Sequence, residues 1–233
     1  MTPQRYQIIC QVLRQRQPDL TVITDEVHKG RNLSAIVRTC DAVGISKFHC
    51  VEPEKGYRGF RGTALGSHKW VETVLHDNVS DGLGQLKEEG FQVVAAHLSD
   101  DAVDFRSIDY TQPTAILMGT EKQGVSDNAL ALADHKVVIP MMGMVESFNV
   151  SVACAIILTE AQAQRQKAGL YDHSRIPALE YQKILFQWCQ PIVTKYCDKN
   201  GLSYPPLDDE GEIVDPAKWY QRVRELKAEV VEA

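Results

Sequence analysis

Two short apolar runs, residues 91–97 and 114–118, most constrain what this chain can fold into. Neither run alternates with polar residues, and uninterrupted runs of this length are typical of strands buried on both faces of a parallel sheet. Other strand-like stretches are separated by helical patterns, which predicts an α/β fold with one parallel sheet. The strands are expected at Leu20–Thr24, Lys47–Val51, Val71–Leu75, Phe91–His97, Thr114–Met118 and Lys136–Met141.

Helices are expected between these strands and on both flanks of the sheet region. Asn32 is a plausible N-cap, and Gly44, Gly90 and Gly169 are placed to end helices. The chain is therefore divided into an N-terminal helical extension (1–19), an α/β core (20–168) and a C-terminal helical extension (169–233). The helices are expected at Arg5–Arg16, Asn32–Val43, Asp81–Glu89, Ser126–Ala133, Asn149–Lys167, Ala178–Tyr196 and Pro216–Glu229.

Composition narrows the class of protein. No apolar run approaches the roughly 18 residues that a membrane span needs, and the N-terminus lacks a signal-peptide pattern. The six cysteines are irregularly spaced, which favours reduced thiols in a cytoplasmic protein. The net charge is −6, but residues 1–70 have an excess of Lys and Arg, and the acidic excess lies in residues 71–134. A nucleic-acid partner is not excluded, because RNA binding requires a local basic face and not a basic total.

The segment from His28 to Gly44 contains polar residues that packing does not readily explain. Asn32 and Arg38 are six residues apart, which separates them by about 120° around an ideal helix. Both can still face one cavity near the start of that helix. The alternative is structural, with Asn32 as a cap and Arg38 as a surface cation.

The segment from Ile116 to Ser126 passes from an apolar strand through a Gly-rich loop into a helix. This arrangement is a common ligand site in α/β sheets. Gly119 and Gly124 permit close approach of the backbone, and Glu121 is the acid on the loop. The loop has neither G-x-G-x-x-G nor the Lys-Ser/Thr of a phosphate-binding loop, so those two nucleotide pockets are not indicated. An ordinary strand-to-helix turn is the alternative.

The segment 137–155 combines a strand, a Met-rich loop and the start of a long helix, with Ser147 or Asn149 as its cap. Methionines on both sides of Gly143 indicate an adaptable apolar pocket. A cluster of core methionines followed by a normal cap is the alternative.

In this order, the three segments resemble motifs 1, 2 and 3 of the SpoU branch of the SPOUT RNA methyltransferases. The matching patterns are N-x-x-x-x-x-R, M-G-x-E-x-x-G and I-P-M-x-G-x-x-x-S-x-N-V-S. The resemblance covers about residues 20–167. The helical flanks and the stretch 97–106 are similar to the TrmH family within this branch, whose members methylate guanosine 18 in the D-loop of tRNA.

The resemblance implies a parallel α/β sheet whose C-terminal part forms a trefoil knot, and a homodimer formed through the knot. It also implies S-adenosyl-L-methionine (SAM) as the cofactor, held at the ends of the strands. By position, the implied cofactor-binding residues are Ala96, Gly119, Ile139, Met141 and Phe148.

The implied reaction is attack of a ribose 2′-OH on the methyl group of SAM. Since a guanidinium is effectively never deprotonated, we expect Arg38 to fix the neighbouring phosphate and lower the pKa of the 2′-OH. The phosphate then accepts the proton, and general-base action by Arg38 is the alternative. The family builds its site across the dimer, so Arg38 can act on SAM held by the other subunit. The implied catalytic residues are Arg38, Asn32, Glu121, Ser147 and Asn149.

For the tRNA partner, the expected contacts are basic side chains from the N-terminal extension and the core. The candidates are Arg5, Arg14, Arg31 and Arg165, with the tract 55–61 as a further one. Two other functions stay open from the sequence. One is the same 2′-O-methylation on ribosomal RNA or on a tRNA wobble nucleotide, and the other is a non-catalytic tRNA-binding or chaperone protein on the same scaffold.

Overall fold

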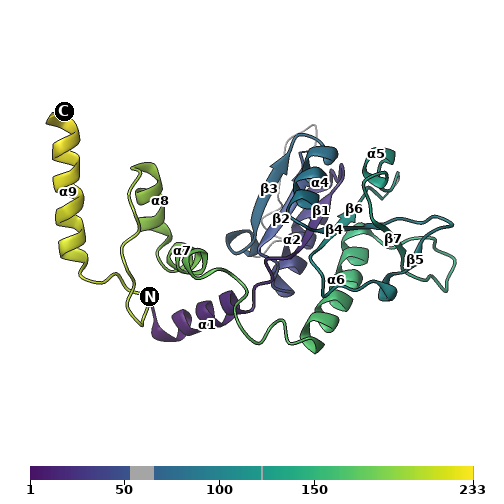
Figure 1. The fold of residues 1–233 in the computed structure, drawn as a ribbon, viewed down its shortest axis with the longest axis horizontal. Helices are drawn as coiled ribbons and strands as arrows, with labels where there is room; N and C mark the ends of the chain where they lie inside the picture. The colour runs from purple at the N-terminus through teal and green to yellow at the C-terminus, as the bar shows by residue number, and fades with distance from the viewer. Residues whose placement is uncertain (53–65, 122, 233) are drawn as a thin grey trace. The chain divides into compact units, whose positions relative to one another are not determined.

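The computed structural model describes residues 1–52, 66–121 and 123–232. Within these residues, seven parallel strands form one sheet in the order β3-β2-β1-β6-β4-β7-β5 (Figure 1). The predicted parallel α/β sheet is thus confirmed, whereas the trefoil knot stays a prediction. The strands are β1 (Leu20–Thr24), β2 (Lys47–Val51), β3 (Glu72–His76), β4 (Gln92–Ala96), β5 (Val103–Asp104), β6 (Thr114–Met118) and β7 (His135–Val138).

Helices cover both faces of the sheet because successive residues of the central strands point in opposite directions. In β6, Ile116 packs into the apolar cluster formed with α2 and α6, whereas Leu117 packs into the cluster formed with α4 and α5. The helices of this region are α2 (Gly30–Ala42), α4 (Val79–Glu88), α5 (Asp127–Leu130) and α6 (Val150–Lys167), with short 3₁₀ turns η1 (Ser67–Lys69) and η2 (Phe105–Ser107).

The pairing register brings three strand ends together. Ala96 of β4 lies opposite Met118 of β6 and Val137 of β7. Because these strands are parallel, the loops that follow them leave the same edge of the sheet. The loops after β4, β6 and β7 therefore lie side by side, and they contain most of the residues predicted to form the site.

The chain separates into two compact units, residues 15–175 and residues 1–14 with 176–233. The first contains the sheet. The predicted boundaries were 19/20 and 168/169. Residues 15–19 and 169–175, which were predicted to belong to the helical extensions, lie in the sheet unit because they form hydrogen bonds to it. Gln17 Nε2 donates to the Leu170 carbonyl at 3.0 Å, and the Tyr171 hydroxyl donates to the Val43 carbonyl at 2.7 Å. The functional division into a tRNA-contacting N-terminal extension, a catalytic core and a C-terminal helical extension stays a prediction.

The second unit is helical. Tyr181 donates its hydroxyl to the Cys10 carbonyl at 3.4 Å, and Phe186 stacks on Tyr204 with 4.7 Å between ring centroids. One long helix was predicted over Ala178–Tyr196, but Pro191 has no N–H to donate and begins a new helix. The helices of this unit are α1 (Pro3–Arg14), α7 (Ala178–Cys189), α8 (Pro191–Lys199) and α9 (Pro216–Glu232).

The state of the cysteines and the character of the helices agree with what the composition predicted. All six cysteines are free thiols, and five of them are buried. Burial raises the pKa of the Cys154 thiol to about 12, which makes it unreactive. None of the described helices is long and apolar enough to span a membrane.

Candidate active site

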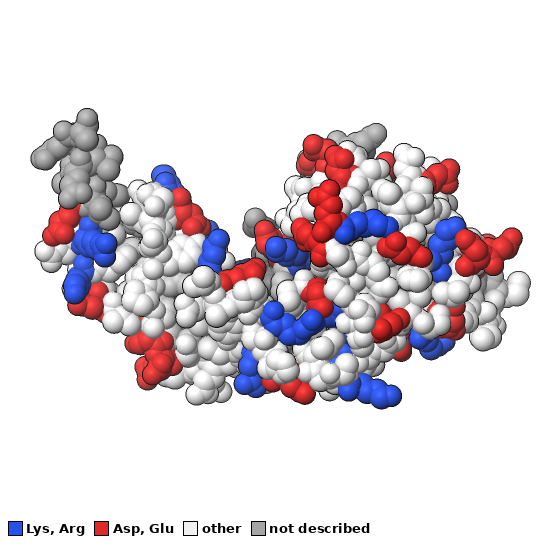
Figure 2. Space-filling view, in the orientation of Figure 1, with Lys and Arg blue, Asp and Glu red and all other residues white. Residues whose placement is uncertain are grey.

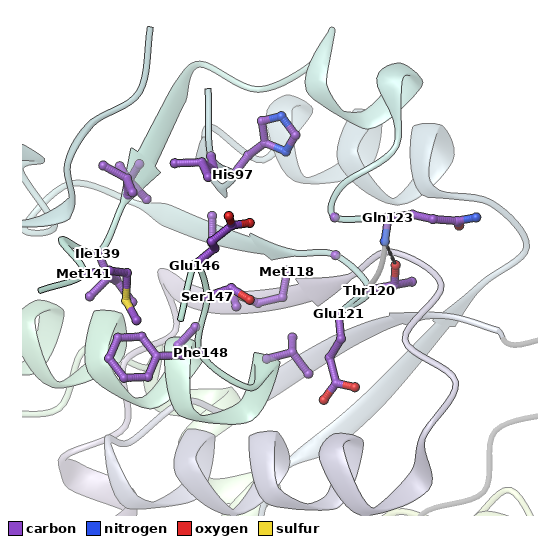
Figure 3. Close-up of a pocket in the computed structure, with 18 residues that line it drawn as sticks. His97, Met118, Thr120, Glu121, Gln123, Ile139, Met141, Glu146, Ser147 and Phe148 are labelled. Carbon is purple, nitrogen blue, oxygen red and sulfur yellow. Dashed lines mark hydrogen bonds between the residues drawn. The ribbon is translucent and has the colours of Figure 1, made fainter. Parts of the chain in front are cut away.

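A cavity of about 340 Å³ opens where β4, β6 and β7 end, and we call it the sheet-end cavity. In Figure 3, Ile139, Met141 and Phe148 lie on one side of it and Thr120, Glu121 and Gln123 on the other. Ser147 and Glu146 come from the loop after β7. The structure thus places all five predicted cofactor-binding residues around one cavity: Ala96, Gly119, Ile139, Met141 and Phe148.

The loop after β6 makes an unusually close backbone approach. A Cβ atom on Gly119 would lie 2.1 Å from the carbonyl carbon and oxygen of Gly124, where no side chain fits. Thr120 and Gly124 exchange backbone hydrogen bonds of 2.8 and 3.0 Å, and Gly124 has a left-handed φ of 71°. Glycine is therefore required at position 119 by space and favoured at 124 by conformation.

The loop after β7 is apolar and exposed. Met142 and Met144 are 95% and 99% exposed, and Val145 is 63% exposed. The loop ends at Asn149, which is the N-cap of α6 because its side-chain oxygen accepts the Ser151 N–H at 3.0 Å. Soluble proteins seldom expose large side chains together in this way unless the surface meets a partner.

Four polar side chains from three segments meet beside the cavity, and we call them the Glu121 cluster. Glu121 Oε1 accepts hydrogen bonds from Asn149 Nδ2 at 2.6 Å and Asn32 Nδ2 at 3.1 Å. Asn149 Nδ2 also donates to Asn32 Oδ1 at 3.3 Å, and Lys29 forms an ion pair with Glu121. Three of the five predicted catalytic residues are thus in direct contact.

Charge and amide donors hold Glu121 in its ionised form. The hydrogen bond from Lys29, followed by the one from Asn32, keeps the pKa of the Glu121 carboxyl below its ordinary value. The site therefore presents a carboxylate that is oriented by amide donors at the starts of two helices, α2 and α6.

Lys29 was not predicted from the sequence. The pattern placed Asn32 at the N-cap of the second helix, but the helix begins at Gly30 and Lys29 is its N-cap residue, with no side-chain capping bond. Asn32 therefore lies in the first turn, which frees its amide to bond Glu121. The only sequence signal for Lys29 is its position three residues before Asn32.

A second cavity of about 360 Å³ adjoins the first, and we call it the side cavity. Its floor is apolar, since it is formed by the side chains of Val27 and Val150, which are 4% and 5% exposed. Four residues line both cavities: Thr120, Glu121, Gln123 and Val150. The remaining lining of the side cavity comes from Val27, His28, Lys29 and Asn32.

A buried aspartate joins the loop after β6 to the segment that leads into α2. Asp25, 3% exposed, follows β1 and accepts the backbone N–H of Ser126 at 2.8 Å. This bond ties the end of the Gly119–Gly124 loop to the segment that enters α2. The next residue, Glu26, has a φ of 51°, a strained conformation for a residue that is not glycine.

The structure does not bring Arg38 into the cluster. Arg38 is exposed on α2 and lines neither cavity, and within the described residues it has no hydrogen-bond or ion-pair partner. Ser147 lines the sheet-end cavity without bonding to the cluster.

The predicted RNA contacts differ in burial. Arg5 and Arg14 are exposed on α1, and Arg31 is exposed on α2. The tract 55–61 lies outside the described residues. On the face shown in Figure 2, basic and acidic side chains are interspersed over the sheet unit, so charge on this face does not mark an RNA site by itself.

The prediction that Arg165 binds RNA is wrong, because its side chain is fully buried. Its five donors form five bonds within the fold: to the carbonyls of Tyr110, Asp19 and Gln112 and to the side chains of Gln17 and Asp19, at 2.7–3.1 Å. Arg175 also pairs with Asp19, at 2.5 Å. We call these residues the Arg165 network: Gln17, Asp19, Arg165 and Arg175.

Comparison with known proteins gives consistent matches. A model described as the SpoU rRNA Methylase family matches residues 19–159, and one described as SpoU, rRNA methylase, C-terminal, matches residues 163–216. The tRNA (guanosine(18)-2′-O)-methyltransferase of Escherichia coli (strain K12) is 50% identical over 222 residues, which are 94% of this chain and 97% of that protein.

Solved structures also match the fold. The crystal structure of the A. aeolicus TrmH/SpoU tRNA modifying enzyme is 47% identical, with a TM-score of 0.76 over 79% of this chain and 94% of that one. An AdoMet-bound rRNA methyltransferase from Sinorhizobium meliloti is 30% identical, with a TM-score of 0.58 over 68% of this chain and 60% of that one.

Proposed function

The chain belongs to the SpoU rRNA methylase family, and we propose that it methylates the ribose 2′-OH of guanosine 18 in the D-loop of tRNA. The observation that carries this proposal is the 50% identity to a tRNA (guanosine(18)-2′-O)-methyltransferase over almost the full length of both proteins. That match includes helical flanks as well as the sheet unit, and flanks of this kind are where substrate choice can be encoded. We also propose that the protein acts in the cytoplasm.

We propose SAM as the cofactor and the sheet-end cavity as its site. When bound, SAM supplies an electrophilic methyl group on a cationic sulfonium. The residues present fit it: Met118, Ile139 and Phe148 offer apolar contacts to an adenine, and the bare Gly119 turn lets backbone groups approach it. The carboxylates of Glu121 and Glu146 suit a ligand with positive charges.

The Glu121 cluster orients the acceptor in this proposal. Glu121 and Asn149 are fixed to one another at 2.6 Å, so their remaining lone pairs and N–H groups are already in place when a ribose arrives. Preorganised groups reduce the entropy that is lost when two reactants are aligned. Ser147, on the loop after β7, lines the sheet-end cavity and is proposed to contact the same acceptor.

Arg38 acts as an electrostatic group and not as a base. Its guanidinium keeps its proton at neutral pH, so its role is to bind the phosphate next to the acceptor ribose and favour loss of the 2′-OH proton. That phosphate is the proposed proton acceptor. A fork of two N–H groups fits a phosphate better than a lysine ammonium does.

The position of Arg38 supports a homodimer. Arg38 lies outside both cavities of its own chain, whereas the exposed loop with Met142, Met144 and Val145 needs a cover. Two copies paired through this loop and the start of α6 would bury those side chains. Because α2 packs beside α6, such pairing can bring Arg38 of one copy to the sheet-end cavity of the other.

The direct test is to incubate the protein with tritiated SAM and unmodified tRNA transcripts, then to locate the label by nuclease mapping. Ribosomal RNA and a transcript with adenosine at position 18 run in parallel. Label at guanosine 18 alone is expected. Label confined to ribosomal RNA would reject the substrate while retaining the chemistry, and a failure to bind SAM or label either RNA would favour a non-catalytic RNA-binding protein.

A further inference from the structure

The side cavity shares a wall with the proposed cofactor site. Thr120, Glu121, Gln123 and Val150 line both spaces. Methyl transfer requires the reacting atoms to approach to about 3–3.5 Å, so acceptor and donor must occupy adjacent spaces. We propose that the side cavity receives the acceptor nucleotide, and that Lys29 binds a phosphate of that nucleotide after leaving Glu121. This inference rests on the proposed RNA methylation.

The lining of the side cavity has the chemistry of a nucleotide site. Val27 and Val150 form an apolar floor against which a base can lie. His28, Asn32 and Gln123 surround it with polar groups suited to a ribose or to a base edge. The volume, about 360 Å³, lies within the range of small-ligand sites.

Lys29 is placed to change partners. Its side chain is 69% exposed, so its ammonium remains hydrated while it pairs with Glu121. Exposed ion pairs of this kind add little to stability, so exchanging the carboxylate for a phosphate costs little. Glu121 keeps its bonds to Asn32 and Asn149 throughout, so the exchange does not release the carboxylate from the site.

The rival explanation is that Lys29 only positions Glu121. In that case its effect would pass through the carboxylate and would vanish when the carboxylate is replaced by an amide. A phosphate contact has a different signature, because each neutralised phosphate contributes about 0.7–0.9 to the slope of log affinity against log salt concentration.

The experiment measures binding of the full-length protein to a tRNA transcript over a series of KCl concentrations. Lys29→Met is compared with wild type, with Lys29→Arg, and with Lys47→Met, a control at the opposite end of the strands. Lys29→Met is expected to reduce the slope by about 0.7–0.9, and Lys29→Arg and Lys47→Met to leave it unchanged. An unchanged slope in Lys29→Met would overturn the proposal.

The same comparison in a Glu121→Gln background separates the two roles. The loss of slope is expected to persist there, and its disappearance would mean that Lys29 acts only on Glu121. SAM affinity, measured by calorimetry, is expected to stay within about twofold of wild type in Lys29→Met, and a larger loss would place Lys29 in the cofactor site. Wild-type protein that transfers no methyl group to any tRNA would instead overturn the proposed function itself.

Discussion

The Glu121 cluster and the Arg165 network lie at opposite ends of the same helix, and they use similar side chains for different purposes. Asn149 caps the start of α6 and bonds Glu121, whereas Arg165 lies in its last turn and bonds Asp19. The cluster is exposed beside two cavities. Arg165, at the centre of the network, is fully buried and uses every one of its guanidinium donors. Polar groups with all partners inside the fold maintain the structure, and those that border a cavity remain available to a ligand.

The largest effect is expected from Arg165→Ala. Removing one partner of a buried ion pair typically costs about 3–5 kcal/mol, because the other charge remains buried. Arg175 still pairs with Asp19, which places the loss toward the lower end of that range. Urea unfolding measures it, with the exposed Arg106→Ala as the control, expected to cost at most about 1 kcal/mol.

Arg165→Ala also tests the division between the two regions. Methyl transfer per folded molecule is expected to stay near that of wild type. A stable variant with weakened tRNA binding would contradict the structural role and restore Arg165 as an RNA contact.

Arg38→Ala should give the converse result. Loss of an electrostatic contact to the reacting charge typically lowers kcat by about 100- to 1000-fold. The free energy of unfolding is expected to change by less than about 0.5 kcal/mol, because Arg38 is exposed and unpartnered among the described residues. Single-turnover methylation and urea unfolding of Arg38→Ala and Arg38→Lys provide the test. Full activity in Arg38→Lys would exclude the bidentate phosphate contact.

The Arg38 variants also test the dimer. Mixing Arg38→Ala with a variant defective in SAM binding should restore part of the activity if each site combines two copies. Mixtures that remain as inactive as their components would reject a site shared between subunits.

Gly119→Ala is expected to have an intermediate effect, which falls on the sheet-end cavity and not on the Arg165 network. The added Cβ has to displace the Gly124 backbone, and overpacking of this kind costs about 1–3 kcal/mol, or roughly 5- to 150-fold in SAM affinity if the loop opens. Gly143→Ala is a matched control on the next loop, since a Cβ there meets nothing within 4 Å. Calorimetry with SAM distinguishes them, and equal affinities for the two variants would contradict the assignment of the cavity.

The sequence predicted the sheet and most of the cluster because each has a local signal. β1, β2 and β6 match the predicted strands residue for residue, and for β6 the signal was a continuous apolar run of the kind typical of a strand buried on both faces. Asn32, Glu121 and Asn149 lie in recognisable patterns that the structure brings together. The four-residue helix α5 was predicted too long, and the two-residue strand β5 was not predicted. Such short elements depend on packing more than on periodicity.

Arg165 shows where the interpretation failed although a signal existed. It lies four residues after Ala161 and seven after Leu158, both fully buried, so helical periodicity places it on the apolar face of α6. A basic side chain was interpreted by its charge and not by its position. Lys29 and Asp25 had no such signal, because their roles arise from contacts with loops about a hundred residues away.

The smallest expected effect concerns the ionisation of Glu121. Its pKa is lowered first by the Lys29 hydrogen bond and then by Asn32, so Lys29→Met should raise the pKa toward the ordinary glutamate value. A carboxyl with a lowered pKa in the fold stabilises it above the unfolded-state pKa, and that contribution is lost as the pH falls through the folded pKa. Replacing Lys29 therefore removes stability at neutral pH, and the difference from wild type disappears as the pH falls through the folded pKa of Glu121.

Carbon NMR of glutamate-labelled protein follows this titration directly, with Lys47→Met as the control. An unchanged Glu121 pKa in Lys29→Met would mean that Asn32 and Asn149 alone hold the carboxylate. The cluster would then resemble the Arg165 network in its self-sufficiency, and Lys29 would be free for RNA from the start.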